Sequence, residues 1–76
     1  MELQEFIEIF ASQFDETDAQ EFTANTTFKN MKEWSSILAL SIIAMADEEY
    51  EVKLKGDDIR NSNTIEDLFD IVKSRM

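Results

Sequence analysis

The stretch Ser35-Ser-Ile-Leu-Ala-Leu-Ser-Ile-Ile-Ala-Met-Ala-Asp-Glu-Glu-Tyr50 decides the fold of this 76-residue chain. It contains neither Gly nor Pro, and it predicts a helix over residues 36–50. Ser35 suits the N-cap, because its hydroxyl oxygen can accept an unpaired amide N–H of the first turn. The inward face of this helix is expected to consist of Ala39, Ile42, Ile43, Ala46 and Tyr50.

The opposite face of the same helix is also largely apolar. It holds Ile37, Leu40 and Ala44, with Met45 at its edge. A domain of this size cannot easily cover a helix on all sides. These side chains therefore either form an exposed patch that docks against partner proteins or lie beneath neighbouring loops, and the pattern leaves both interpretations open.

Before this helix, the chain predicts one further helix and a long connection. Large apolar residues recur at helical spacing and indicate an amphipathic helix over roughly residues 2–14: Leu3, Phe6, Ile7, Phe10 and Phe14. Residues 15–34 are mostly polar and form a loop of unusual length. Phe22 and Phe28 are expected to pin that loop to the core.

After this helix, residues 51–56 predict a loop in which Val52 and Leu54 turn inward and Gly56 supplies a turn. Asp57 to Ser62 predict one short helical turn that buries Ile59.

The last helix has clear end signals. Thr64 suits its N-cap, and Glu66 and Asp67 would occupy its first turn. Lys73 and Arg75 lie near its end, so the order of charges complements the helix dipole.

Composition supports an all-α fold. The chain has one Gly and no Pro, whereas an all-β fold needs many tight turns. Its length is enough for one domain, which we expect to span residues 1–76. No stretch is long and apolar enough to span a bilayer and no signal peptide is visible, so we expect a cytoplasmic protein.

The net charge of −10 restricts the possible partners. The first 28 residues contain seven acids and no base, which disfavours nucleic acid and an anionic membrane. We expect protein partners with basic patches, although the charge could serve solubility alone. A monomer fits this charge.

No residue constellation supports catalysis. The chain has no His and no Cys, so a nucleophile with its usual base and the common zinc sites are both absent. The single Gly excludes a glycine-rich phosphate loop. We therefore expect no catalytic residues and no metal site.

Ser36 has two interpretations when its neighbourhood is considered alone. A Ser-Ser pair before an apolar helix usually supplies a cap. However, a hydroxyl at a helix N-terminus faces unpaired N–H groups and the positive end of the helix dipole, where an attached phosphodiester would be stabilised.

The stretch from Phe28 to Tyr50 resembles the centre of acyl carrier proteins. It is most similar to the subgroup with Glu-Trp-Asp-Ser-Leu before the second helix, which reads Glu33-Trp-Ser-Ser-Ile37 here. The resemblance continues through Val52-Lys-Leu54 and Asn63-Thr-Ile-Glu-Asp-Leu68 and covers nearly the whole chain.

This resemblance implies a four-helix bundle with a long first loop and a short third helix. It implies that Ser36 receives 4′-phosphopantetheine from coenzyme A through a separate phosphopantetheinyl transferase that uses Mg²⁺. Acyl groups would then be carried as thioesters for enzymes of lipid or secondary-metabolite biosynthesis. Partner enzymes would dock on the second helix, at Ile37, Leu40, Ala44, Asp47 and Glu48.

Three positions depart from the family pattern. Ser35 stands in place of Asp, Ile37 in place of Leu, and Ser41 in place of an acid. Ser35 can cap the helix, but it cannot supply the carboxylate that, by family analogy, helps to position the metal and the transferase. The alternative hypothesis is therefore an interaction module with the carrier fold and no prosthetic group.

Overall fold

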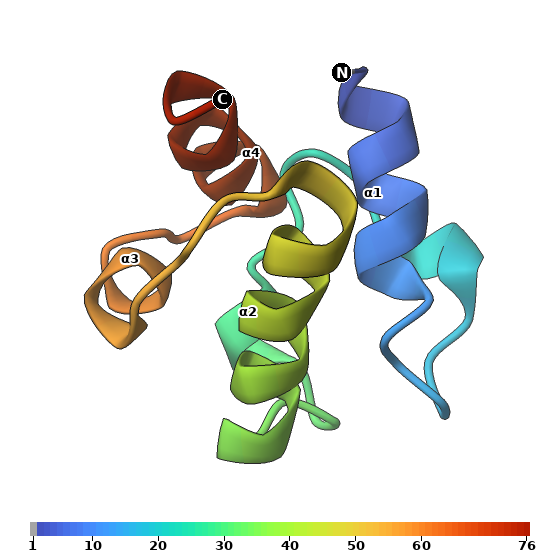
Figure 1. Cartoon of the computed structure of the whole chain (residues 1–76). Helices are drawn as coiled ribbons and strands as arrows, with labels where there is room; N and C mark the ends of the chain where they lie inside the picture. The colour runs from blue at the N-terminus through green and yellow to red at the C-terminus, as the bar shows by residue number, and fades with distance from the viewer. Residues whose placement is uncertain (1) are drawn as a thin grey trace.

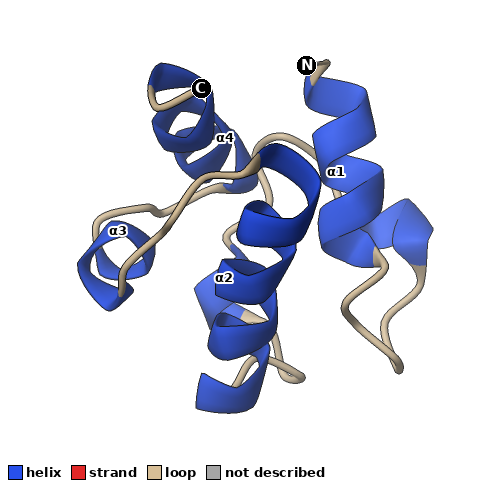
Figure 2. Cartoon of the chain, viewed as in Figure 1, coloured by secondary structure: helices blue, strands red, loops and turns tan. Residues whose placement is uncertain are grey.

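The computed structural model describes residues 2–76 and places helices around a core of aromatic side chains. The elements follow the order α1 (Leu3–Ala11), η1 (Ala19–Glu21), η2 (Phe28–Asn30), α2 (Ser36–Tyr50), α3 (Gly56–Arg60) and α4 (Ile65–Ser74). Figure 2 shows helices joined by loops, and residues 2–76 contain no strand. This architecture confirms the prediction of an all-α, four-helix fold with a long first loop and a short third helix.

Helix α1 ends earlier than its apolar spacing predicts. It stops at Ala11 rather than near residue 14, because the chain tightens there into hydrogen bonds between residues three apart. The N–H of Gln13 donates to the carbonyl of Phe10, and the N–H of Phe14 donates to that of Ala11. Phe14 still reaches the core, with 6 % of its surface exposed.

The long loop crosses the bundle between α1 and α2 (Figure 1). Phe22 and Phe28 are buried in the core, which confirms the prediction that they hold the loop in place. The loop also supplies acceptors to the start of α4. The carbonyls of Thr26 and Ala24 accept the N–H groups of Ile65 and Glu66, which have no partner within the helix.

Helix α2 has the predicted bounds, but its inward face differs in part. Ile42 and Ala46 are fully buried, as expected. The prediction for Met45 was wrong, because this side chain is 3 % exposed and packs in the core. Leu38 is buried too, whereas Ala39 is only half-buried. The inward face is therefore rotated slightly towards Leu38 and Met45.

The left-handed conformation that usually favours glycine occurs at Glu51, after α2, and not at Gly56, where a turn was predicted. Glu51 adopts the left-handed conformation after α2, with φ 57°. Gly56 does not form the predicted turn. It is the first residue of α3, has no positive φ, and has open space where a Cβ would be added. Val52, Leu54 and Ile59 are buried as predicted.

Helix α4 begins with the predicted cap. The N–H of Asp67 donates to the hydroxyl of Thr64 at 3.1 Å, and the N–H of Thr64 donates to the Asp67 carboxylate at 3.1 Å. This reciprocal arrangement satisfies donors that the first turn would otherwise leave unpaired.

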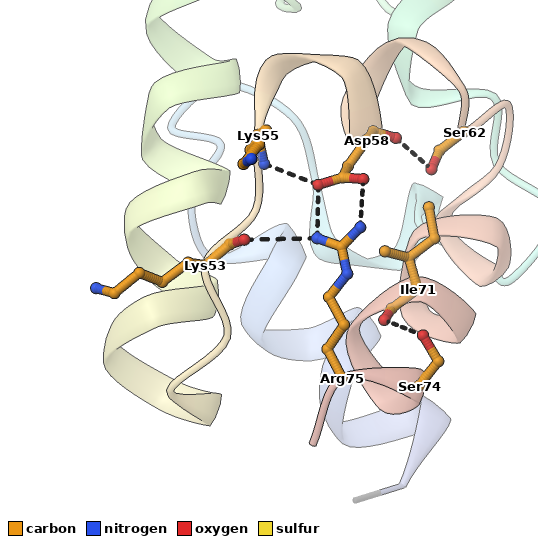
Figure 3. A network of polar contacts seen from close by, with 7 residues as sticks. All are labelled: Lys53, Lys55, Asp58, Ser62, Ile71, Ser74 and Arg75. Atoms are coloured by element: carbon orange, nitrogen blue, oxygen red, sulfur yellow. Dashed lines mark hydrogen bonds and ion pairs between the residues drawn. The ribbon is translucent and has the colours of Figure 1, made fainter.

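A polar network ties α3 to the end of α4 (Figure 3). Both terminal nitrogens of Arg75 donate to the carboxylate of Asp58 at 2.7 Å, and the N–H of Lys55 donates to the same carboxylate at 2.9 Å. The hydrogen bonds from Arg75, followed by that from Lys55, hold the pKa of Asp58 below its usual value of 3.8.

The positions of Glu51 and Gly56 yield one prediction. Glu51→Gly should stabilise the protein by about 0.5–1 kcal/mol, because Gly adopts positive φ without a Cβ clash. Gly56→Ala should stabilise it by about 0.4–1 kcal/mol, because Ala restricts the unfolded chain and fits the helix. Urea unfolding measures both changes.

Glu51→Gln is the control for the first variant, because it removes the charge and keeps the side chain. If Glu51→Gln stabilised the protein as much as Glu51→Gly, the left-handed conformation would not be the cause.

The network around Asp58 yields a second prediction. Because the pKa of Asp58 is lower when the protein is folded, its ionisation stabilises the fold above pH 3.8, and this stabilisation is lost as the pH falls through the lowered pKa. Asp58→Asn should cost about 1 kcal/mol at pH 7 and make stability less dependent on pH below 4.

Asp70→Asn, at an exposed position on α4, makes the same change in charge and serves as the control. Equal pH profiles of unfolding free energy for the wild type and Asp58→Asn would contradict this account.

Candidate functional site

The start of α2 presents two adjacent serines in different roles. Ser35 caps the helix, as predicted: its hydroxyl accepts the N–H of Leu38 at 3.4 Å, and its carbonyl accepts the N–H of Ala39 at 3.0 Å. Ser36 is the first residue of the helix and its side chain is exposed. Both serines are exposed, and they differ in that the hydroxyl of Ser35 is engaged by the cap.

Trp34 anchors the segment before the two serines. Its ring stacks on Phe14 with the centroids 6.3 Å apart, and it meets Phe28 edge-on at 5.0 Å. Both phenylalanines belong to the buried core. The backbone that leads to Ser35 is thus fixed by aromatic packing on two sides.

Glu33 provides a second anchor by joining the two ends of the long loop. Its carboxylate accepts the N–H of Asp15 at 2.9 Å, the N–H of Glu16 at 3.2 Å and the hydroxyl of Thr17 at 2.8 Å. Desolvation acts to raise the pKa of Glu33, but the hydrogen bonds from Thr17, Asp15 and Glu16 together hold it below its usual value of 4.5.

The electrostatic surroundings of Ser36 suit a phosphoryl group. The N–H groups of Ser36 and Ile37 have no intrahelical acceptor and lie at the positive end of the helix dipole. The first acid on α2 is Asp47, ~16 Å farther along the helix. A phosphodiester on Ser36 would therefore meet no carboxylate on the adjoining turns of α2.

The five residues predicted to dock partners all have exposed side chains. Ile37 and Leu40 are 74 % and 66 % exposed, which is unusual for large apolar side chains. Ala44, Asp47 and Glu48 follow on the same side of the helix at spacings of three and four residues. No loop covers this face. These five residues form a stripe along α2 that is apolar near Ser36 and acidic at its far end.

Two cavities flank the long loop, and neither is lined by a residue of α2. The first, of about 460 Å³, lies beside Glu16, Met31 and Glu33. The second, of about 380 Å³, lies between α1 and the start of the loop.

Within residues 2–76, no group of three or more acidic side chains is arranged to hold a metal ion. None of the helices in this part of the chain has the length and apolar character needed to cross a bilayer.

Comparison with known protein families identifies the chain. The sequence profile described as the phosphopantetheine attachment site matches residues 4–72. The chain belongs to the phosphopantetheine attachment site family. No curated protein and no solved structure matches it.

Membership of the phosphopantetheine attachment site family confirms the carrier role and the cofactor expected from the sequence. The family carries 4′-phosphopantetheine as a covalent group, and its domains are in general non-catalytic. The exposed hydroxyl of Ser36, at a helix start without nearby acids on α2, fits such a group. The likeness to the Glu-Trp-Asp-Ser-Leu subgroup remains a prediction.

Sequence reasoning missed the role of Glu33, although Glu33 lies within the motif quoted for the resemblance. Its carboxylate oxygens accept the backbone N–H groups of Asp15 and Glu16. Hydrogen bonds between residues so far apart in the chain leave no periodic pattern in the sequence. The only available hint was the position of an acid directly before Trp34.

Glu33 yields a third prediction. Glu33→Gln leaves one oxygen in place of a carboxylate that accepts from three groups, so the amides of Asp15 and Glu16 should exchange with solvent faster. Hydrogen exchange measured by NMR tests this, with the amide of Val72 inside α4 as an internal reference.

Glu21→Gln removes the same charge near the same cavity and serves as the control. Unchanged exchange at Asp15 and Glu16 in Glu33→Gln would show that Glu33 does not anchor the loop.

Proposed function

We propose that this chain is an acyl carrier protein whose 4′-phosphopantetheine arm is attached to the hydroxyl oxygen of Ser36. The observation that supports this most directly is the exposed Ser36 at the first position of α2, directly after the cap, within the matched residues 4–72. When bound, the arm supplies a terminal thiol that holds an acyl group as a thioester.

Ser36 contributes the oxygen to the attachment step. Its hydroxyl oxygen forms the new bond to phosphorus and loses its proton to a base of the transferase. The phosphoanhydride bond of coenzyme A breaks, and the adenosine bisphosphate leaves. Ser35 supports this step indirectly, because its cap holds the first turn of α2 in place.

The stripe from Ile37 to Glu48 is the proposed docking surface for the phosphopantetheinyl transferase and for acyl-processing enzymes. Ile37 and Leu40 would bury apolar surface against the partner close to the arm. Asp47 and Glu48 would attract a basic patch at the other end of α2 and guide association.

The remaining features of the proposal concern the setting in which the carrier acts. We infer one carrier domain over residues 1–76 that works as a cytoplasmic monomer and has no nucleic acid or membrane partner. The net charge of −10 supports the monomer and the lack of nucleic acid and membrane partners, because it opposes both self-association and binding to anionic surfaces.

The second candidate function is an interaction module without the arm. It is favoured by one feature, the hydroxyl of Ser35 at the position where the resembled family has a carboxylate. In that case the exposed stripe of α2 would bind a basic partner, and Ser36 would only begin the helix.

Attachment at Ser36 is the fourth prediction. The wild type, incubated with coenzyme A, Mg²⁺ and a broad-specificity phosphopantetheinyl transferase, should gain one phosphopantetheine group by intact-protein mass. Ser36→Ala should gain none and keep its helical circular dichroism. The matched variant Ser35→Ala should still be modified, with α2 weakened by about 0.5–1 kcal/mol.

Modification of Ser36→Ala would contradict the assignment of the site. A wild type that neither the broad transferase nor the transferase of the same organism modifies would favour the interaction module instead.

A further inference from the structure

A groove on the α1 side of the molecule is a second candidate interaction surface. It lies between α1 and the first part of the long loop, which run beside each other on the right of Figure 1, away from α3. None of its lining residues belongs to α2. It is therefore separate from the proposed docking stripe and from Ser36.

The groove has an apolar floor and a polar rim. Its floor comes from core side chains that keep 4–6 % of their surface exposed: Ile7, Ala11, Phe14 and Phe22. Polar residues also line it: Glu8 on α1, Ser12 directly after α1, and Thr17 in the loop. Its volume of about 380 Å³ lies within the ~300–1,000 Å³ range of ligand pockets.

The segments that form the groove carry only acidic charges, and one of these acids, Glu8, lines the groove itself. Exposed acids lie on α1 and on the adjoining loop: Glu5, Glu8, Asp15, Glu16, Asp18 and Glu21. No Lys or Arg occurs before Lys29, so the stretch that lines the groove, residues 4–22, contains no base. Glu5 and Glu8 are three residues apart on one helix, where like charges destabilise the helix slightly.

The loop that forms one wall is held in a defined position. The carboxylate of Glu33 binds the N–H groups of Asp15 and Glu16 and the hydroxyl of Thr17, and Phe14 and Phe22 pack against each other with their ring centroids 4.9 Å apart. The groove is thus formed before any partner arrives, which lowers the entropic cost of binding.

We propose that this groove binds a short basic segment of a partner protein, with one apolar side chain of that segment inserted between α1 and the loop. The apolar floor accounts for the inserted side chain, and the surrounding carboxylates account for flanking Lys or Arg. Because a groove of this size can bury only a short segment, we expect weak binding. Because the attraction is between charged side chains, we expect salt to weaken it. This function needs neither the arm nor the α2 stripe.

The test uses a synthetic peptide of Lys residues with one central Leu, and a control peptide with Ser in place of that Leu. Each is titrated into the ¹⁵N-labelled chain at low salt and at 0.3 M salt. We expect the Leu peptide to shift the amide signals of Ile7, Ala11 and Phe22 and to bind more tightly than the Ser peptide. High salt should weaken its binding.

Matched charge variants locate the site. Glu8→Gln, at the rim, should weaken binding of the Leu peptide by about threefold. Asp70→Asn, which makes the same charge change on an exposed position of α4, should leave the affinity within about 1.5-fold.

Three results would each overturn the proposal. The signal changes could be confined to residues 37–48, the two peptides could bind equally tightly, or Glu8→Gln and Asp70→Asn could change the affinity equally. Repeating the titration with Ser36→Ala separates it from the proposed carrier function, because groove binding should persist whichever residue holds the arm.

Discussion

The aromatic cluster around Phe10 is the constraint on which the rest of the structure depends. The fully buried ring of Phe10 packs against four other phenylalanines: Phe6, Phe14, Phe22 and Phe28. Phe6 lies on α1, Phe14 follows α1, and Phe22 and Phe28 lie in the long loop. Phe14 and Phe28 in turn hold Trp34. Because Trp34 directly precedes the cap of α2, a loop whose regular structure is limited to the short helices η1 and η2 still places Ser36 at a defined point on the surface.

Local signals explain what could be predicted from the sequence. The bounds of α2, the caps Ser35 and Thr64, and the burial of Phe22 and Phe28 depend on residue type and spacing. The early end of α1 and the left-handed Glu51 are made by local hydrogen bonds, but neither Ala11 nor Glu51 is a residue that usually ends a helix, so the sequence carries no signal for them. The inward turn of Met45 depends on packing against the rest of the core, which no short-range pattern encodes. The anchoring of the loop by Glu33 was missed for the same reason.

The distribution of charge separates two kinds of surface on α2. Its first three turns carry no charge, and their exposed side is apolar at Ile37 and Leu40. The acids of α2 lie at its C-terminal end, where the helix dipole disfavours them and Lys53 pairs with Asp47 at 3.3 Å. Acids at the C-terminal end of α2 do not stabilise the helix, so their position fits a surface that recognises a partner.

The most direct test of the central claim is peptide mapping of the protein isolated from its own cells. Trypsin cuts after Lys32 and Lys53, so one peptide contains both Ser35 and Ser36, and fragmentation between them locates any modification. The account predicts one phosphopantetheine group on Ser36. A group on Ser35, or a peptide that is unmodified throughout growth, would contradict it.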